Sequence, residues 1–263
     1  MASGIDWVFE QVEEAIILED DCLPLPTFFR FCDELLERYR HDERVMCISG
    51  INLESGLRAR PFSYRFSCFN LCWGWASWRR AWRYFDMTLK LWPALRHTSW
   101  LPDILEDHKA VEFYKKEFNW AYERAGDLDN WDYQWTFACW AQHGLSILPT
   151  TALVTNIGFG EQATHTKLAH DKRAFLPTQE ISFPLQHPSY VIRDREADQV
   201  LMRQIVVFNQ SEEFCGYSWL RQKYRALLTR HPSLKSPRAF IRRVGERCSA
   251  AVAGAARKLM ASL

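Results

Sequence analysis

The sequence lacks the features that mark several classes of protein. None of its eight cysteines belongs to a CxxC pair, and no spacing typical of a zinc site occurs. The amino terminus has neither the basic start nor the apolar stretch of a secretory signal peptide. No apolar run approaches the roughly 20 residues of a membrane-spanning helix, and there is no internal repeat or low-complexity segment. We therefore expect a globular protein with reduced thiols in the cytoplasm.

Aromatic residues stand out in an otherwise ordinary composition. The 263 residues are 48% apolar and 25% charged, and they include 12 Trp and 17 Phe. Because such rings bury large areas, we expect most of them in the core, while exposed Trp faces could stack on sugars. Cys32, Cys47 and Cys139 lie in apolar patterns, so we interpret them as small core residues. The length allows one large domain or two small ones.

The net charge of +1 conceals an acidic body and a basic tail. From Arg221 onward the chain has 11 Lys or Arg and one acid, Glu246, which gives +10 and leaves −9 on the rest. An acidic body disfavours nucleic acid as a partner. Residues 237–260 place apolar side chains loosely on one helical side and basic ones on the other. This pattern predicts binding to an anionic membrane surface; a helix docked on the acidic body and a disordered end are the alternatives.

A short apolar run ends in three carboxylates within residues 15–21, Ala-Ile-Ile-Leu-Glu-Asp-Asp. The apolar part has no polar alternation, which is typical of a strand buried on both faces in a parallel sheet. Glu19, Asp20 and Asp21 then lie at its carboxyl end, where open α/β sheets bind ligands. Packed carboxylates favour a hard cation such as Mg²⁺ or Mn²⁺, which can hold a diphosphate. The alternative is a solvated acidic turn before a helix.

Helical and strand-like patterns alternate along the chain. A helix at 5–14 leads directly into the strand at 15–18, which is half of a βαβ unit. Thr27 is the predicted N-cap of the next helix, and Gly144 the predicted C-cap of a later one. The other expected helices cover 27–40, 76 onward, 101–105, 108–124, 132–144 and 196–209. The other expected strands cover 45–49, 64–69, 145–148 and 152–155.

Four blocks of the sequence, in this order, resemble one family of enzymes. The blocks are Ala15–Pro24, Trp73–Trp82, Asn130–Trp140 and Asn156–Thr166. They resemble the bacterial sugar-transferase relatives of N-acetylglucosaminyltransferase I, over roughly residues 1–190. The resemblance implies an α/β fold of the GT-A type, Rossmann-like with a mixed sheet, that transfers sugars from nucleotide-diphospho-sugars.

The resemblance also predicts how the chain is divided. Relatives of this kind have a nucleotide-binding half before the helix with which this sequence starts. We therefore expect an N-terminally incomplete GT-A domain at 1–190, followed by a helical, basic C-terminal extension at 191–263.

The family's acidic triplet is Glu-Asp-Asp, as in this sequence. By resemblance, Asp21 binds the divalent metal, Mn²⁺ or Mg²⁺, that holds the donor diphosphate. Glu19 and Asp20 would contact the ribose side or orient water ligands of the metal. His165, in Ala-Thr-His-Thr, could touch the metal or the diphosphate, although a single loop histidine more often does neither.

A Trp-Asp motif at a helix start carries the general base of this family. Trp131-Asp132 matches it. Asp132 would accept the proton of the acceptor hydroxyl, with Trp131 shielding it from water. Asp129 is the second choice, and a helix N-cap or first-turn acid is the structural alternative for Asp132.

Trp73, Gly74 and Trp75 correspond to a Gly-Trp loop near the donor sugar in the family. Gly74 would let the backbone turn closely between two large rings. Packing in the core is the alternative for these tryptophans, and for Trp78 and Trp82 it is the preferred interpretation.

The sequence thus predicts a metal-dependent inverting glycosyltransferase for hexosyl or N-acetylhexosaminyl transfer. Its donor would be a nucleotide-sugar and its acceptor a glycan or lipid-linked glycan, as in polysaccharide biosynthesis, in the cytoplasm or peripheral to the inner face of the membrane. One alternative is a catalytically inactive, truncated binding or assembly module of the same fold. Another is a metal-dependent phosphotransferase or nuclease that uses the same acids, against which the acidic body argues.

Overall fold

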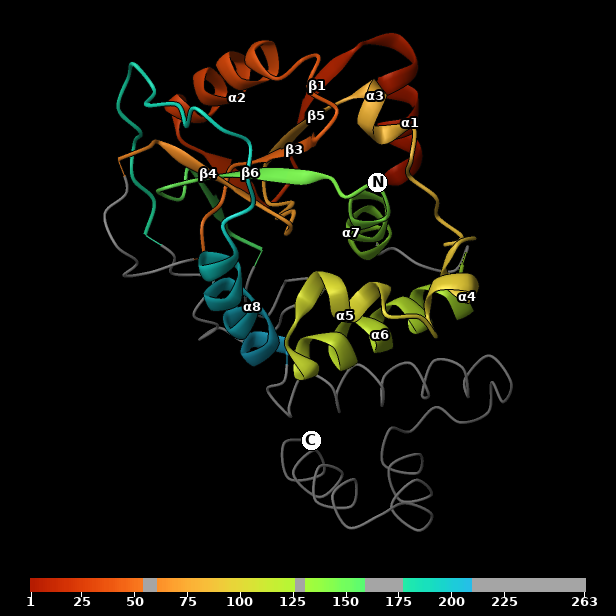
Figure 1. Cartoon of the computed structure of the whole chain (residues 1–263). Helices are drawn as coiled ribbons and strands as arrows, with labels where there is room; N and C mark the ends of the chain where they lie inside the picture. Colours follow the sequence, from red (N-terminus) through yellow and green to blue (C-terminus); the bar gives the residue numbers. More distant parts are fainter. Residues whose placement is uncertain (54–60, 126–130, 159–176, 210–263) are drawn as a thin grey trace, which may run out of the picture. The chain divides into compact units, whose positions relative to one another are not determined.

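A five-stranded mixed sheet organises residues 1–203, the first of two units of the chain; the second is 204–263 (Figure 1). The computed structural model describes residues 1–53, 61–125, 131–158 and 177–209. The strands of the sheet lie in the order β1-β5-β3-β6-β4. They are β1 (Glu14–Ile17), β3 (Val45–Ser49), β4 (Tyr64–Ser67), β5 (Trp75–Trp78) and β6 (Leu145–Pro149).

The sheet combines both kinds of strand pairing. β3 and β6 are parallel, whereas β1–β5, β3–β5 and β4–β6 are antiparallel. The fold is therefore α/β with a mixed sheet and helices, compatible with a Rossmann-like fold, which confirms the prediction at that level.

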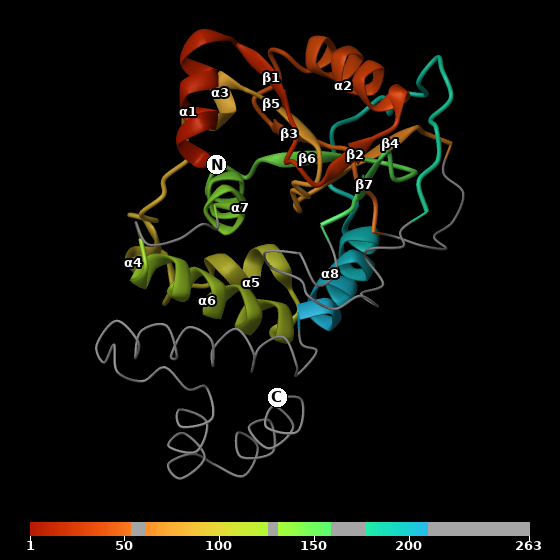
Figure 2. The same cartoon turned by 180° about the vertical axis from the view of Figure 1, so that it is seen from behind.

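Helices lie on both faces of the sheet (Figures 1 and 2). On one face α2 contributes Phe28, Phe31 and Leu35 to the main hydrophobic core. On the other face Trp135 of α7 packs against Trp75 of β5, with ring centroids 5.8 Å apart. The helices are α1 (Ala2–Gln11), α2 (Pro26–Arg38), α3 (Arg79–Trp82), α4 (Trp92–Leu95), α5 (Trp100–Leu105), α6 (His108–Glu123), α7 (Asp132–Ala141) and α8 (Arg195–Asn209). In the described part of the chain, none of them has the length and apolar character needed to cross a membrane.

Several predicted elements and core residues are confirmed. Strand β3 and helices α6 and α8 lie within a residue of their predicted bounds. Trp78 and Trp82 are buried, with 2% and 4% of their surface exposed. Cys32, Cys47 and Cys139 are completely buried, as expected for small core residues.

The position of β1 differs from the prediction. It is an edge strand that pairs antiparallel with β5, and its four residues are only half-buried. An edge strand has one neighbour, so its apolar run reflects partial cover by α1 and α2 rather than burial inside a parallel sheet. Among the described residues, no strand pairs with its outer edge.

The helix predicted from residue 76 onward was wrong in its first part. Residues 75–78 form β5, and only Arg79–Trp82 is helical. Trp78 and Trp82 are four residues apart, which imitates a helical face. Pairing of β5 with both β1 and β3 outweighs that local signal.

Both predicted helix caps were also wrong. α2 begins at Pro26 with Leu25 as its N-cap, because proline suits the first helical position. The Thr27 hydroxyl instead donates a hydrogen bond to Glu180. α7 ends at Ala141, with Gln142 as its C-cap, two residues before Gly144.

A buried carboxylate ties the start of α8 to β4. Asp198 accepts hydrogen bonds from Arg65 (2.8 Å), Ser67 (2.6 Å), the Cys68 amide (3.0 Å) and Arg193 (2.7 Å). This one carboxylate therefore links α8 both to β4 and to the segment around Arg193 that precedes the helix.

A second polar network joins α2 and β4 to the segment at 187. The hydroxyls of Tyr39 and Tyr64 lie 2.7 Å apart, and the Tyr64 hydroxyl lies 2.9 Å from Nδ1 of His187. Nε2 of His187 lies 3.1 Å from Glu34. The imidazole therefore has a partner on each nitrogen.

Candidate functional site

The candidate site lies beyond the carboxyl end of β1. β1 and β3 both run antiparallel to β5, so their carboxyl ends lie at the same edge of the sheet. After the acids the chain enters β2 (Cys22–Pro24), which pairs with β7 (Val154–Asn156). Glu19 and Asp21 are half-buried and Asp20 is exposed. The triplet thus follows the end of a strand, as predicted, at the edge of the sheet where β1 and β3 both end.

The β2–β7 pair fixes Asp21. Its main-chain oxygen accepts a hydrogen bond from Ile157 (2.8 Å), and the Cys22 thiol donates to Oδ1 at 3.6 Å. Burial raises the pKa of Cys22 to about 11, so this thiol keeps its proton. A Cβ atom on Gly158 would lie 2.1 Å from Oδ2 of Asp21, so the carboxylate rests directly on the glycine backbone.

Glu19 points to the aromatic side of the site. Nε1 of Trp131 donates a hydrogen bond to Oε1 of Glu19 at 3.4 Å. Burial is the main cause that raises the pKa of Glu19, and the neighbouring charges of Asp21 and Asp132 raise it further. The structure therefore brings the acidic triplet and the Trp131-Asp132 motif into one site, although they lie 112 residues apart in the chain.

Asp132 is the first residue of α7 and is exposed. Burial raises the pKa of Cys72 and of Tyr114, and the charge of Asp132 adds to both shifts. Burial also raises the pKa of Glu117, where Asp132 again adds to the shift. An exposed carboxylate at a helix start, next to other acids, is suited to accept a proton from a bound hydroxyl.

Stacked tryptophans support the Trp131-Asp132 motif. Trp131 stacks on Trp75 with centroids 5.4 Å apart. Trp75 has no exposed surface, so its role is to support Trp131 rather than to touch a sugar. Gly74 has a φ of +65°, which confirms the tight turn expected there, and its oxygen accepts from Gly50 at 2.7 Å. Trp73 is half-buried.

Two of the sequence candidates are outside the described residues. These are His165 and Asp129. Their predicted roles stay predictions.

Sequence reasoning missed two residues near these acids, Cys72 and Glu117, whose pKa values the charge of Asp132 helps to raise. Each belongs to an apolar or helical pattern that gives no signal of a site.

The donor set fits a hard divalent cation. Carboxylate oxygens are the ligands that Mg²⁺ and Mn²⁺ prefer, and the half-buried Asp21 carboxylate lies against the Gly158 backbone. Within the described ranges, no group of three or more His, Cys, Asp or Glu has the arrangement of a complete metal site. Asp21 with one neighbouring acid would hold such a cation together with a ligand's phosphates and water.

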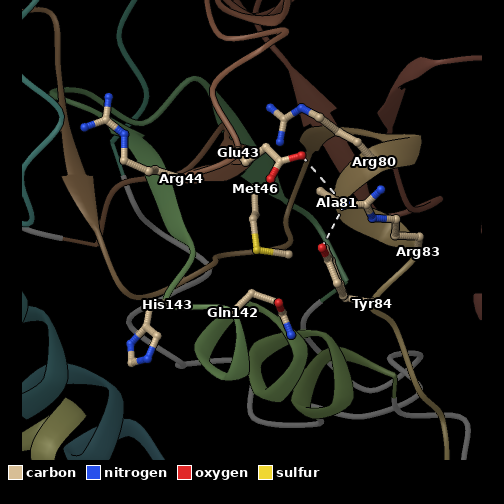
Figure 3. Close-up of a pocket in the computed structure, with 9 residues that line it drawn as sticks. All are labelled: Glu43, Arg44, Met46, Arg80, Ala81, Arg83, Tyr84, Gln142 and His143. Carbon is tan, nitrogen blue, oxygen red and sulfur yellow. Dashed lines mark hydrogen bonds and ion pairs between the residues drawn. The ribbon is translucent and has the colours of Figure 1, made fainter.

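A cavity of about 240 Å³ lies at the other end of the sheet (Figure 3). The cavity lies beside the amino end of β3. The acids follow the carboxyl end of β1, which runs in the same direction as β3, so the cavity and the candidate site lie at opposite edges of the sheet. Arg80 donates to the main-chain oxygens of Arg40 and Tyr39 at 2.8 Å each. The lining residues are Glu43, Arg44, Met46, Arg80, Ala81, Arg83, Tyr84, Gln142 and His143.

No protein-family model and no curated protein matches this chain.

Proposed function

We propose that this protein is a metal-dependent inverting glycosyltransferase of the GT-A type. One observation carries the proposal: the acidic triplet after β1 and the Trp131-Asp132 motif share one site, at the edge of the sheet where β1 ends. The triplet supplies hard ligands for a cation and its diphosphate. Asp132 supplies an exposed base a short distance away. These are the two groups that a direct displacement at a sugar carbon requires.

The residues divide the reaction between them. Asp132 removes the proton from the acceptor hydroxyl as its oxygen bonds to the anomeric carbon. The bond from that carbon to the β-phosphate oxygen breaks, and its electron pair leaves with the diphosphate. A divalent cation, when bound by Asp21, supplies a positive charge that stabilises the departing diphosphate. A single attack opposite the leaving group inverts the anomeric carbon.

Glu19 and Trp131 prepare this arrangement. The Trp131 indole holds Glu19 by its hydrogen bond and directly precedes Asp132, the first residue of α7. Trp131 is buried, so it shields the half-buried Glu19 from water and strengthens the electrostatic interactions on that side of the site.

The donor sugar, the glycan or lipid-linked acceptor and the anionic membrane remain predictions from the sequence. The tail expected to bind membrane lies outside the described residues. The cytoplasmic location is likewise a prediction.

Calorimetric titration with nucleotide-sugars in the presence and absence of Mn²⁺ tests the proposal. We expect Mn²⁺-dependent binding by the wild-type chain and its loss in Asp21→Ala, without a large loss of stability. Asp132→Asn should bind the donor normally, while kcat falls by about 10²- to 10⁴-fold, since a base acts in the transition state. Asp103→Ala, an exposed acid of α5, is the matched control.

The outcomes separate the candidate functions. Mn²⁺-dependent binding with no turnover by the wild type would identify an inactive binding module. No binding of any nucleotide-sugar with Mn²⁺ would overturn the proposal. Normal turnover by Asp132→Asn would exclude Asp132 as the base and turn attention to Asp129.

A further inference from the structure

The cavity beside the amino end of β3 has an excess of positive charge. Arg44, Arg80 and Arg83 bring three guanidinium groups to it, whereas Glu43 is the one carboxylate among its lining residues in the described part of the chain (Figure 3). Arg83 and His143 are exposed, so the cavity is open to solvent and a ligand can enter it. Its charge favours an anion.

Arg80 is a half-buried charge whose partners are neutral. Its Nε and Nη2 donate to the main-chain oxygens of Arg40 and Tyr39, and its guanidinium lies 4.3 Å from the centre of the Trp78 ring. Within the described ranges it forms no ion pair with a carboxylate, and no hydrogen bond uses its Nη1. The guanidinium therefore keeps both an uncompensated charge and donors for a ligand.

The two acids whose charges act on Arg80 are paired with other arginines. Asp42 forms an ion pair with Arg44 at 2.6 Å, and Glu43 lies 3.7 Å from Arg83. Burial is the main cause that lowers the pKa of Arg80, against these two acids, and the charge of Arg83 lowers it further. The Glu43–Arg83 pair is long and exposed, so it contributes little and Glu43 can turn toward solvent.

Arg80 and Arg83 lie on one face of a helical turn. α3 ends at Trp82, and Arg83 continues its helical backbone with φ −54° and ψ −21°. Side chains three residues apart on a helix are neighbours. Guanidinium groups bind phosphate through two parallel N–H donors each, so an adjacent pair suits a phosphate group. Gln142 at the end of α7 lines the same cavity and adds an amide donor.

The size of the cavity limits the ligand. Its volume of about 240 Å³ is below the roughly 300–1,000 Å³ of pockets for drug-sized ligands. Met46 and Ala81 are buried and give it an apolar wall for the carbon part of a ligand. We propose that this cavity is a second binding site, in which Arg80 and Arg83 hold the phosphate group of a small phosphomonoester. The site does not depend on the proposed glycosyl transfer.

Calorimetric titration in EDTA tests the site without divalent cations. The salt concentration is kept at about 20 mM, because salt screens such contacts. The probes are inorganic phosphate, glycerol 3-phosphate, glucose 6-phosphate and, as an uncharged comparison, glucose. We expect the wild type to bind a phosphomonoester more tightly than inorganic phosphate, and not to bind glucose.

Three variants locate the phosphate. Arg83→Gln should weaken phosphomonoester binding about tenfold or more, because charge-assisted hydrogen bonds are lost, and its melting temperature should stay level. Arg80→Lys keeps the positive charge but not the planar fork, so we expect a similar loss. Glu43→Gln removes the carboxylate that would repel the phosphate and should bind about two- to fivefold more tightly.

Arg195→Gln is the matched control for Arg83→Gln. Arg195 is also an exposed arginine in an ion pair, with Glu106, but it belongs to α8 and does not line the cavity. We expect this variant to bind phosphomonoesters as the wild type does.

The other results count against the inference. A wild type that binds none of the three phosphate probes would overturn it, as would wild-type affinity in both Arg80→Lys and Arg83→Gln. Equal losses in Arg83→Gln and Arg195→Gln would show general attraction to surface charge. Binding of inorganic phosphate alone would show a site for the free ion only. Phosphate binding that requires Mn²⁺ would point to the acidic triplet instead. The proposed function is tested with nucleotide-sugars and Mn²⁺, so it stands or falls separately.

Discussion

At the scale of single residues, Gly158 determines where the Asp21 carboxylate lies. Replacing Gly158 by Ala would put Cβ 2.1 Å from Oδ2 and 2.9 Å from Cβ of Asp21, so the acid must move. We expect Gly158→Ala to weaken Mn²⁺ binding by about 10- to 100-fold, the effect usual for groups that orient a metal ligand. Calorimetric titration with Mn²⁺ measures this directly.

Gly4 of α1 provides a matched glycine. No atom lies within 4 Å of a Cβ built there, and it is inside a helix. Gly4→Ala should leave Mn²⁺ binding unchanged and stabilise the fold by about 0.4–1 kcal/mol. Unchanged Mn²⁺ affinity in Gly158→Ala would show that Asp21 does not bind the cation.

Single residues also show what the sequence could predict about the site. Glu19, Asp21 and Asp132 belong to local motifs, so the sequence alone could propose them as site residues. Cys72 and Glu117 were missed because their closeness to Asp132 is a property of the folded structure. Gly158 lies in the Asn156–Thr166 block, but its role could not be predicted, since its contact with Asp21 joins segments far apart in the chain.

At the scale of elements, Asp198 joins α8 to β4. It is completely buried and pairs with Arg65 and Arg193. Asp198→Asn removes a buried charge that Arg65 and Arg193 share, so we expect a loss of about 3–5 kcal/mol in the free energy of unfolding. Urea denaturation followed by circular dichroism measures it.

The same substitution at an exposed acid is the control. Asp103→Asn in α5 changes a surface hydrogen bond to Ser99 and should cost less than about 0.5 kcal/mol. A loss below about 1 kcal/mol in Asp198→Asn would mean that the network contributes little.

Elements differ in how well their patterns predicted them. α6 and α8 have polar and apolar faces, so their period was clear. β5 is completely buried, and a short buried run has no polar face to reveal its period. Its strand pairing on both sides, and the edge position of β1, depend on the tertiary structure.

At the scale of the whole molecule, His187 should make stability depend on pH. Burial, and then the charge of Arg38, lower the pKa of His187 from 6.5, against the opposing effect of Glu34. The folded state therefore binds this proton less readily than the unfolded chain does. The stability that His187 contributes is therefore fully present above pH 6.5, the ordinary pKa of histidine in the unfolded chain. It is lost as the pH falls from 6.5 toward the lower pKa that His187 has in the folded state.

Comparison with His187→Gln isolates this effect. Urea denaturation of both proteins from about pH 8 to about pH 5.5 spans the histidine range. We expect the wild type to lose more stability than the variant on acidification, because glutamine does not titrate. Parallel curves for the two proteins would contradict the assignment.

The outer edge of β1 should also affect the whole molecule, by promoting self-association. No described strand pairs with it, and Leu18 beside it is 37% exposed. Unpaired strand edges recruit other strands, and a lysine there suppresses this. We expect light scattering to show concentration-dependent association of the wild type and less of it in Leu18→Lys. A wild type that stays monomeric at micromolar concentration would show that the edge is protected.

The stack of Trp75 and Trp131 has an optical consequence. The two indoles are 5.4 Å apart and inclined by 26°, close enough for their electronic transitions to couple. Trp131 also donates to Glu19, so a ligand or proton that moves Glu19 will tilt one indole against the other. The site therefore contains its own chromophore pair, and near-ultraviolet circular dichroism should report its occupancy without any added label.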